Sequence, residues 1–218
     1  MIYTYSKKKD GATHLTSHFK VREFACKDGS DTILVSKELV EILEKIRTHF
    51  NKPVTITSGY RTAAHDKKVG GSGKGYHTKG MAADIVVTNV PPEAVALYAQ
   101  SLLGNVGGVE CGCYPSGGYV HVDVRPSKWR AVKAYRDRTY ETISGNLFPM
   151  ISKGSHGQSV VLLQRLLTAQ GFNLGKVDGA CGTLTKQAIQ DYQQSVGLSP
   201  DGICGPLTWA SILKSEKE

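Results

Sequence analysis

Three side chains in the first half of the chain are of the types that hold a catalytic metal ion. His77 and Asp84 are seven residues apart, and His121 follows 37 residues after Asp84. A hydrolytic zinc site takes three protein ligands from histidine or carboxylate and keeps one position for water. Imidazole and carboxylate both suit zinc, so no cysteine is needed. The residue types therefore fit a zinc-dependent hydrolase.

The local pattern around these residues strengthens that interpretation. Residues 119–124 are predicted to form a strand, which places His121 and Asp123 on the same face. Asp84 stands at the head of another predicted strand, and His77 lies on the loop before it. A single histidine in a strand is more often a hydrogen-bonded core residue than a ligand. The joint occurrence of these residues, in one order with a Gly-rich turn and an arginine, favours a site.

Three stretches resemble the D-Ala-D-Ala carboxypeptidase type of zinc peptidase, whose fold is shared with hedgehog signalling domains and lysostaphin-like enzymes. They are S-G-Y-R at 58–61, H-T-K-G-M-A-A-D-I at 77–85 and G-G-Y-V-H-V-D-V at 117–124. The family pattern H-x-x-G-x-A-x-D is present in full. The resemblance covers about residues 19–129.

That resemblance implies the roles of individual residues. Zinc is expected on His77, Asp84 and His121, and Arg61 is expected to hold the carbonyl or carboxylate of the substrate. The implied reaction is metal-assisted hydrolysis of an amide, in which zinc activates water and polarises the carbonyl group.

The general base is the part of the pattern that this chain lacks. In several relatives an acidic residue three positions before the last histidine ligand is the base, and Gly118 stands there in this chain. Asp123 is our first candidate for the base. Orientation of a ligand imidazole by Asp123 is an equally open alternative, and Glu110 is a further candidate for the base.

Other features near these motifs have a simpler interpretation. The segment Gly70–Gly75 does not match the phosphate-binding pattern G-x-x-x-x-G-K-[ST]. We interpret it as a mobile flap beside the metal, with an inert turn as the alternative. Trp129 and Arg130 could line the substrate groove, although packing in the core is the favoured role for Trp129.

The second part of the chain contains an internal repeat. Residues 178–185 (D-G-A-C-G-T-L-T) recur 23 residues later as residues 201–208 (D-G-I-C-G-P-L-T). Each copy is a Gly-rich turn followed by a helical pattern, and a third helical pattern precedes them. Residues 154–213 resemble the peptidoglycan-binding repeat modules of bacterial and phage cell-wall hydrolases, which implies bacterial peptidoglycan as the partner. Cys181 and Cys204 hold equivalent positions in the repeat, which leaves a disulfide between them open.

The elements of the first part mix helices with short strands. An apolar face of Leu39, Leu43, Ile46 and Phe50 predicts a helix after Ser36, and Pro92 opens a second helix with Val95, Tyr98 and Leu102 inward. Short strands are predicted over 53–57, 83–87, 106–109 and 119–124. This pattern predicts an α+β fold with a small antiparallel sheet and flanking helices.

Breaker residues divide the chain near residues 144–157. We therefore predict a zinc peptidase catalytic domain over 1–143, a linker over 144–154 and a peptidoglycan-binding three-helix domain over 155–218.

Composition excludes several classes of protein. The 218 residues are 40% hydrophobic and 21% charged, unlike a disordered chain. No apolar run reaches the ~18–20 residues of a membrane span, and the N-terminus has no apolar region typical of a secretory signal. The net charge of +8 comes without a basic stripe interleaved with aromatic residues, so we expect no nucleic acid or membrane partner. Anionic wall polymers suit this charge better.

The leading hypothesis is an endolysin-like, antimicrobial peptidoglycan peptidase that cuts stem or cross-link peptides. We expect a monomer that is made in the cytoplasm, reaches the cell wall through a membrane lesion and is tethered there by its C-terminal domain. The alternatives are an L-Ala–D-Glu endopeptidase of the same fold, a carboxypeptidase that trims a terminal D-Ala, and a non-catalytic wall-binding protein.

Overall fold

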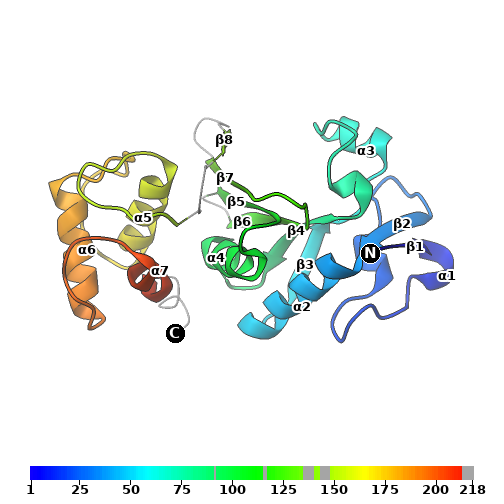
Figure 1. Ribbon diagram of the computed structural model, residues 1–218, viewed down its shortest axis with the longest axis horizontal. Coiled ribbons are helices and arrows are strands. Elements are labelled where there is room, and N and C mark those ends of the chain that lie inside the picture. The colour runs from blue at the N-terminus through cyan, green and yellow to red at the C-terminus, as the bar shows by residue number, and fades with distance from the viewer. Residues whose placement is uncertain (91, 115–116, 135–139, 143–147, 213–218) are drawn as a thin grey trace. The chain divides into compact units, whose positions relative to one another are not determined.

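The computed structural model describes the chain except residues 91, 115–116, 135–139, 143–147 and 213–218. It divides into two compact units, Met1–Thr142 and Ile143–Glu218. The first runs from blue to green in Figure 1, and the second from yellow to red. Within the described residues, no helix has the length and apolar character needed to cross a membrane.

The first unit combines two sheets with helices. Its strands are β1 (Ile2–Ser6), β2 (Thr32–Ser36), β3 (Val54–Ser58), β4 (Ala82–Val87), β5 (Gly108–Tyr114), β6 (Gly117–Asp123), β7 (Trp129–Ala134) and β8 (Tyr140–Thr142). Its helices are α1 (Lys7–Asp10), α2 (Lys37–Phe50), α3 (Ala63–Lys68) and α4 (Pro92–Leu103), with the short 3-10 helices η1 (Val21–Phe24) and η2 (His77–Lys79). The mixture is the predicted α+β class.

The large sheet has the strand order β3-β4-β6-β5-β7-β8, and β1 pairs with β2 in a separate sheet. The four predicted strands correspond to β3, β4, β5 and β6. All neighbours in the large sheet are antiparallel except β5 and β7, which are parallel. The reason is that β4 and β5 already occupy both edges of β6. The chain that leaves β6 joins the sheet at the free edge of β5, and β7 runs in the same direction as β5.

One face of the large sheet is covered by α2 and α4, which pack on each other and on the central strands (Figure 1). The predicted apolar face of α2 is buried along its whole length. In α4, Val95 is buried as predicted, whereas Tyr98 and Leu102 are half-buried. Ala99 and Leu103 face the core in their place, because the small alanine lets the helix approach the sheet closely.

The second unit contains α5 (Gln158–Ala169), α6 (Thr183–Ser195) and α7 (Pro206–Ile212). Two buried glutamines stabilise the Gly-rich turns of the repeat in the same way. Gln164 donates to Asp178 Oδ1 and accepts from the Gly179 amide at 2.8 Å. Gln193 donates to Asp201 Oδ1 at 2.8 Å and accepts from the Gly202 amide at 2.9 Å. Each turn is therefore held by an amide side chain from a preceding helix.

Part of the predicted linker belongs to this second unit. Phe148 and Ile151 are buried, and the Phe148 ring lies 5.1 Å from that of Trp209. Ile151 pairs through its backbone with Cys204. These apolar side chains bring residues 148–154 into the packing of the helical unit, so the segment differs from the free linker expected over 144–154.

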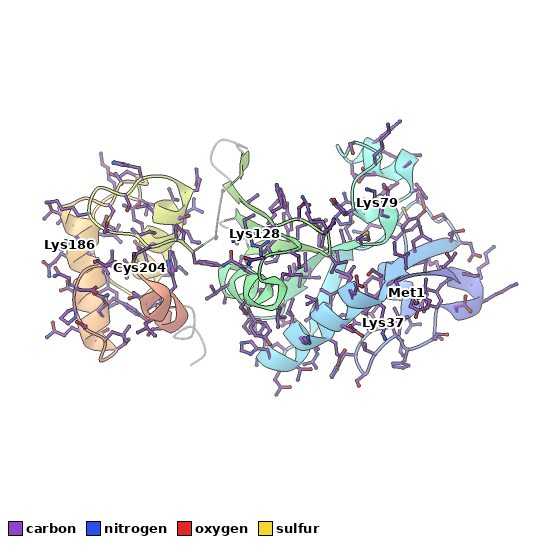
Figure 2. All side chains as sticks on the ribbon, viewed as in Figure 1. Met1, Lys37, Lys79, Lys128, Lys186 and Cys204 are labelled. Atoms are coloured by element: carbon purple, nitrogen blue, oxygen red, sulfur yellow. The ribbon has the colours of Figure 1, made fainter. Side chains whose placement is uncertain are left out.

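Cys181 and Cys204 are both buried and free in the second unit, so the structure has no disulfide between them. Cys204 is labelled in Figure 2, where it lies among the helices of the unit. Burial raises the pKa of both thiols. The thiols therefore pack as small apolar groups.

The glutamine network gives a stability prediction. Replacing Gln193 by Ala leaves the buried amide and carbonyl groups of the second turn without partners, which should cost roughly 2–4 kcal/mol of unfolding free energy. Gln187→Ala is the matched control, because Gln187 lies on the same helix and bonds only the exposed Asp191 in the described structure. Chemical denaturation followed by the fluorescence of Trp209 measures the unfolding free energy of both variants. The Trp129→Phe background removes the other tryptophan of the chain. Equal midpoints for the two variants would contradict the prediction.

Candidate active site

The face of the large sheet opposite α2 and α4 carries a row of polar side chains. Ser58 pairs with Asp84, Asp84 with His121, and His121 with Glu110, on four adjacent strands. Residues paired across antiparallel strands point to the same face and lie close together. The sheet register therefore brings into one row residues that are far apart in the chain.

The three sequence-predicted metal ligands converge at the centre of this row. His121 Nδ1 lies 2.9 Å from Asp84 Oδ1 and 3.2 Å from His77 Nε2. The third edge, from His77 Nε2 to Asp84 Oδ1, is 3.3 Å. A tetrahedral zinc ion with ligands at about 2.0–2.1 Å separates them by about 3.3 Å. The triangle is close to one face of such a tetrahedron, so the residues fit zinc in type, number and spacing.

Hydrogen bonds on the far side of each imidazole set which nitrogen faces the cluster. His77 Nδ1 donates to the carbonyl of Gly59 at 2.8 Å, which leaves the lone pair on Nε2. His121 Nε2 donates to Asp123 Oδ2 at 3.0 Å, so the neutral form of the ring has its lone pair on Nδ1. A partner on the outer nitrogen that fixes the tautomer is the usual arrangement around a metal-binding histidine.

The glycine of the H-x-x-G-x-A-x-D pattern has a structural reason. Gly80 has a φ of 68°, in the left-handed region, as the chain turns from η2 toward β4. A Cβ atom there would lie 2.4 Å from the carbonyl oxygen of Leu34. The Gly80 carbonyl in turn accepts a hydrogen bond from the Ser36 amide at 2.7 Å. This turn places His77 beside the start of the strand that carries Asp84.

Asp123 is completely buried under His121. Its carboxylate accepts hydrogen bonds from the Gly108 amide at 3.0 Å and from the Arg125 amide and Nε at 2.9 and 2.8 Å. Burial raises the pKa of Asp123, but the hydrogen bonds from His121 and Arg125 outweigh it and hold the pKa well below its usual range. Asp123 is therefore an ionised carboxylate surrounded by donors.

Arg61 is placed against Asp84, with part of its guanidinium at the cleft. Its Nη2 donates to Asp84 Oδ2 at 2.7 Å, its Nη1 to Asp66 Oδ1 at 3.2 Å and its Nε to Ser58 Oγ at 2.7 Å. One oxygen of Asp84 thus faces the imidazoles and the other faces Arg61. Sequence analysis expected Arg61 to contact substrate and did not predict that it also holds Asp84.

The charges of the cluster favour a cation. Burial raises the pKa of Asp84, but hydrogen bonds from His121 and His77 outweigh it and keep the carboxyl ionised. Burial lowers the pKa of His121, but hydrogen bonds to Asp123 and Asp84 outweigh it and raise the pKa to about 9. Both shifts follow from the pairing of the Asp84 and Asp123 carboxylates with the imidazoles, so the cluster favours a positive charge.

A cleft of about 460 Å³ opens above the cluster. Its lining includes Arg61, Glu110, Tyr119 and part of the predicted flap over 70–75. The flap is tied to Asp66, whose Oδ2 accepts from the Gly73 amide at 2.8 Å. The segment therefore lies beside the site as expected, and its mobility stays a prediction.

The motifs did not point to Tyr76 and Arg125 on the wall of this cleft. The Arg125 guanidinium lies between the rings of Tyr76 and Trp129, 4.5 and 4.4 Å from their centres. The ammonium group of Lys79, a residue labelled in Figure 2, also lies over the Tyr76 ring, 4.9 Å from its centre. Trp129 thus lines the groove, whereas Arg130 is buried and donates to the Gly107 carbonyl at 2.7 Å. The feature of the sequence that could have identified Arg125 is its position two residues after Asp123.

Two protein families match separate parts of the chain. Residues 15–123, half of the chain, match the family described as Peptidase M15. Residues 156–212 match the family described as putative peptidoglycan binding domain. The first match contains all five residues predicted for the site, and the second contains the repeat.

Individual proteins resemble smaller shares of the chain. The N-acetylmuramoyl-L-alanine amidase CwlM of Mycobacterium tuberculosis is 36% identical over 80 residues, 37% of this chain and 20% of that protein. The spore cortex-lytic enzyme of Bacillus cereus is 38% identical over 68 residues, 31% of this chain and 26% of that protein. The crystal structure of the SleB N-terminal domain is 37% identical, with 32% of this chain and 96% of that chain covered and a TM-score of 0.31. The chain spans only a fifth to about a quarter of the two relatives.

The contact between Asp123 and His121 gives a prediction about metal affinity. Asp123→Asn keeps the size of the side chain but removes the charge that orients His121, so zinc affinity should fall by about 10–100-fold. Competition with a fluorescent zinc chelator measures the dissociation constant in the full chain. Asp191→Asn, at an exposed position of α6, is the control and should bind zinc as the parent does. An Asp123→Asn variant within twofold of the parent would show that this contact does not support the site.

Proposed function

Because the chain belongs to the peptidase M15 family, we propose that it is a zinc-dependent peptidase that hydrolyses amide bonds in the peptides of bacterial peptidoglycan. The observation that carries this proposal is the convergence of His77 Nε2, Asp84 Oδ1 and His121 Nδ1 beside an open cleft. The peptidoglycan-binding domain over 156–212 supports the wall polymer as substrate.

His77, Asp84 and His121 would hold the zinc ion in this proposal. When bound, zinc polarises the scissile carbonyl and lowers the pKa of a bound water toward neutrality. The two histidines are held in the correct tautomer by Gly59 and Asp123.

Asp123 serves to orient His121 in this proposal, the second of the two roles open at the sequence level. Its carboxylate is 0% exposed and already accepts from the His121 ring, the Gly108 amide and Arg125. A general base needs a free lone pair within hydrogen-bonding distance of the water molecule that attacks the amide. The surroundings of Asp123 therefore favour orientation over proton transfer.

Arg61 has two tasks. Its contact with Asp84 Oδ2 orients the carboxylate of the proposed ligand. Arg61 also lines the cleft, and in this proposal its positive charge lies beside the reacting carbonyl. A fixed guanidinium at that point stabilises the oxyanion that develops during hydrolysis. A substrate carboxylate would bind the same charge.

The expected bond lies next to D-alanine in stem or cross-link peptides, on the strength of the H-x-x-G-x-A-x-D resemblance. The C-terminal unit would raise the local concentration of enzyme on the wall without touching the reacting atoms. We expect the protein to act on the cell wall as a monomer.

One variant should lose peptide cleavage and keep binding to the wall. His77→Ala removes one ligand and should abolish release of peptide fragments from purified peptidoglycan, as should a chelator, while sedimentation with the wall is retained because the C-terminal unit is intact. Mass spectrometry of the fragments identifies the cleaved bond. Fragments cut by the parent at a bond next to D-alanine would support the proposal. Fragments cut at the L-Ala–D-Glu bond would instead identify the L-Ala–D-Glu endopeptidase.

The matched control is His14→Ala, which removes an exposed histidine of the first unit that does not line the cleft and should leave cleavage unchanged. Undiminished cleavage by His77→Ala, or cleavage unaffected by chelator, would overturn the zinc peptidase. Binding to the wall without any cleavage by the parent would favour the non-catalytic protein.

A further inference from the structure

We propose that Glu110 is the general base of the hydrolysis and that Tyr119 holds it in position. The inference rests on the proposed function, because it names the residue that moves the proton in that reaction. It is carried by the sheet register, the burial of Glu110, its hydrogen bond and the geometry of position 118.

Position 118, three residues before His121, has no room for an acidic side chain. A Cβ atom on Gly118 would lie 2.1 Å from the carbonyl oxygen of Gly112 and 2.7 Å from Pro92 Cγ. Pro92 begins α4, which covers the face of the sheet opposite the site. Because side chains alternate between faces along a strand, an acid at 118 would also point away from His121. Position 118 therefore cannot supply the base, which must come from elsewhere in the cleft.

Glu110 is the acidic residue that the register places beside His121. The two are directly paired between β5 and β6, so their Cβ atoms are about 4.5–5.5 Å apart on the same face. Glu110 lines the cleft and is 7% exposed. Among the described residues, the group of ligand atoms within 4.8 Å of one another comprises His77, Asp84 and His121 without Glu110. Glu110 thus stands next to the cluster and outside the predicted ligand set.

Tyr119 holds the carboxylate of Glu110 by donating its hydroxyl to Oε1 in a short hydrogen bond. The Tyr119 ring can lie across the strand because Gly112, its partner on β5, has no side chain: a Cβ atom there would lie 2.5 Å from Tyr119 Cε1. With Oε1 engaged by Tyr119, Oε2 is the oxygen that takes the proton. A base held in one rotamer loses less entropy when it acts.

The proton transfer balances as a simple hydrolysis. A water molecule gives one proton to Glu110 Oε2 while its oxygen forms a bond to the carbonyl carbon of the peptide. Glu110 then gives that proton to the amide nitrogen as the carbon–nitrogen bond breaks. The products are a carboxyl group and a free amine, and Glu110 is again a carboxylate.

Glu110→Gln tests the role, because glutamine keeps the shape and the acceptor oxygen for Tyr119 but cannot take a proton. On soluble peptide fragments of peptidoglycan, kcat should fall by about 100-fold or more. KM and the zinc dissociation constant of the metal-depleted protein should stay within about threefold of the parent, since Glu110 is outside the proposed ligand set. Glu41→Gln, an exposed position of α2, is the control and should match the parent in all three measurements.

Tyr119→Phe provides a second variant in the intact chain. It leaves the carboxylate of Glu110 in place without its hydrogen bond, so kcat should fall by about tenfold and zinc affinity should not change. Circular dichroism confirms that both variants are folded. A smaller loss in Tyr119→Phe than in Glu110→Gln is the order expected for a positioning residue and the base that it holds.

The outcomes distinguish this inference from the proposed function. If the parent cleaves the fragments and Glu110→Gln keeps more than about one third of its kcat, the base is another residue and only the inference is overturned. A zinc dissociation constant raised by more than about tenfold in Glu110→Gln would also overturn it, because Glu110 would then act through the metal. A parent without any hydrolysis, despite bound zinc, would overturn both.

Discussion

The hydrogen bond between His121 Nε2 and Asp123 is the interaction on which the rest of the site depends. It turns the lone pair of Nδ1 toward Asp84 and His77, and without it the three ligand atoms would not share one point. A fully buried carboxylate is costly unless it is paired and hydrogen-bonded. The backbone of Gly108 and the guanidinium of Arg125 meet that requirement. The aromatic rings that enclose Arg125 are therefore part of the support of the ligand set.

Sequence analysis found the groups that meet at the cluster because two local signals identify them. The H-x-x-G-x-A-x-D pattern contains His77, Asp84 and the glycine of the turn between them, and the two-residue period of a strand places His121 and Asp123 on one face. The pairing of Glu110 with His121 has no such signal. It depends on the register of β5 against β6, which is set by the hairpin and not by the residues near either side chain.

The difference between local sequence signals and pairing between distant segments also explains which parts of the fold could be predicted. The helix α2 and the strands β3, β4 and β6 have strong apolar periods, and each was predicted close to its observed position. The strands β1, β2, β7 and β8 were not predicted. The pairing of β7 and β8 continues the sheet beyond β5, whereas β1 pairs with β2 in a separate sheet. In the segment after residue 147, glycines and serines predicted a linker, whereas Phe148 and Ile151 take part in the core of the helical unit. Two apolar side chains outweighed the breaker residues around them.

An acid missing from a motif does not by itself argue for a protein that has lost its chemistry. What hydrolysis requires is a carboxylate at a point in space above the sheet, and more than one strand can supply it. In this chain Gly118 is fixed by the close approach of Gly112 and Pro92, so its own strand cannot supply the group there. The neighbouring strand reaches the same region from Glu110, whose partner in the ladder is the proposed ligand His121. The glycine at position 118 and the glutamate at position 110 are then two parts of one arrangement of the sheet, and this arrangement supports the proposed catalytic role of the domain.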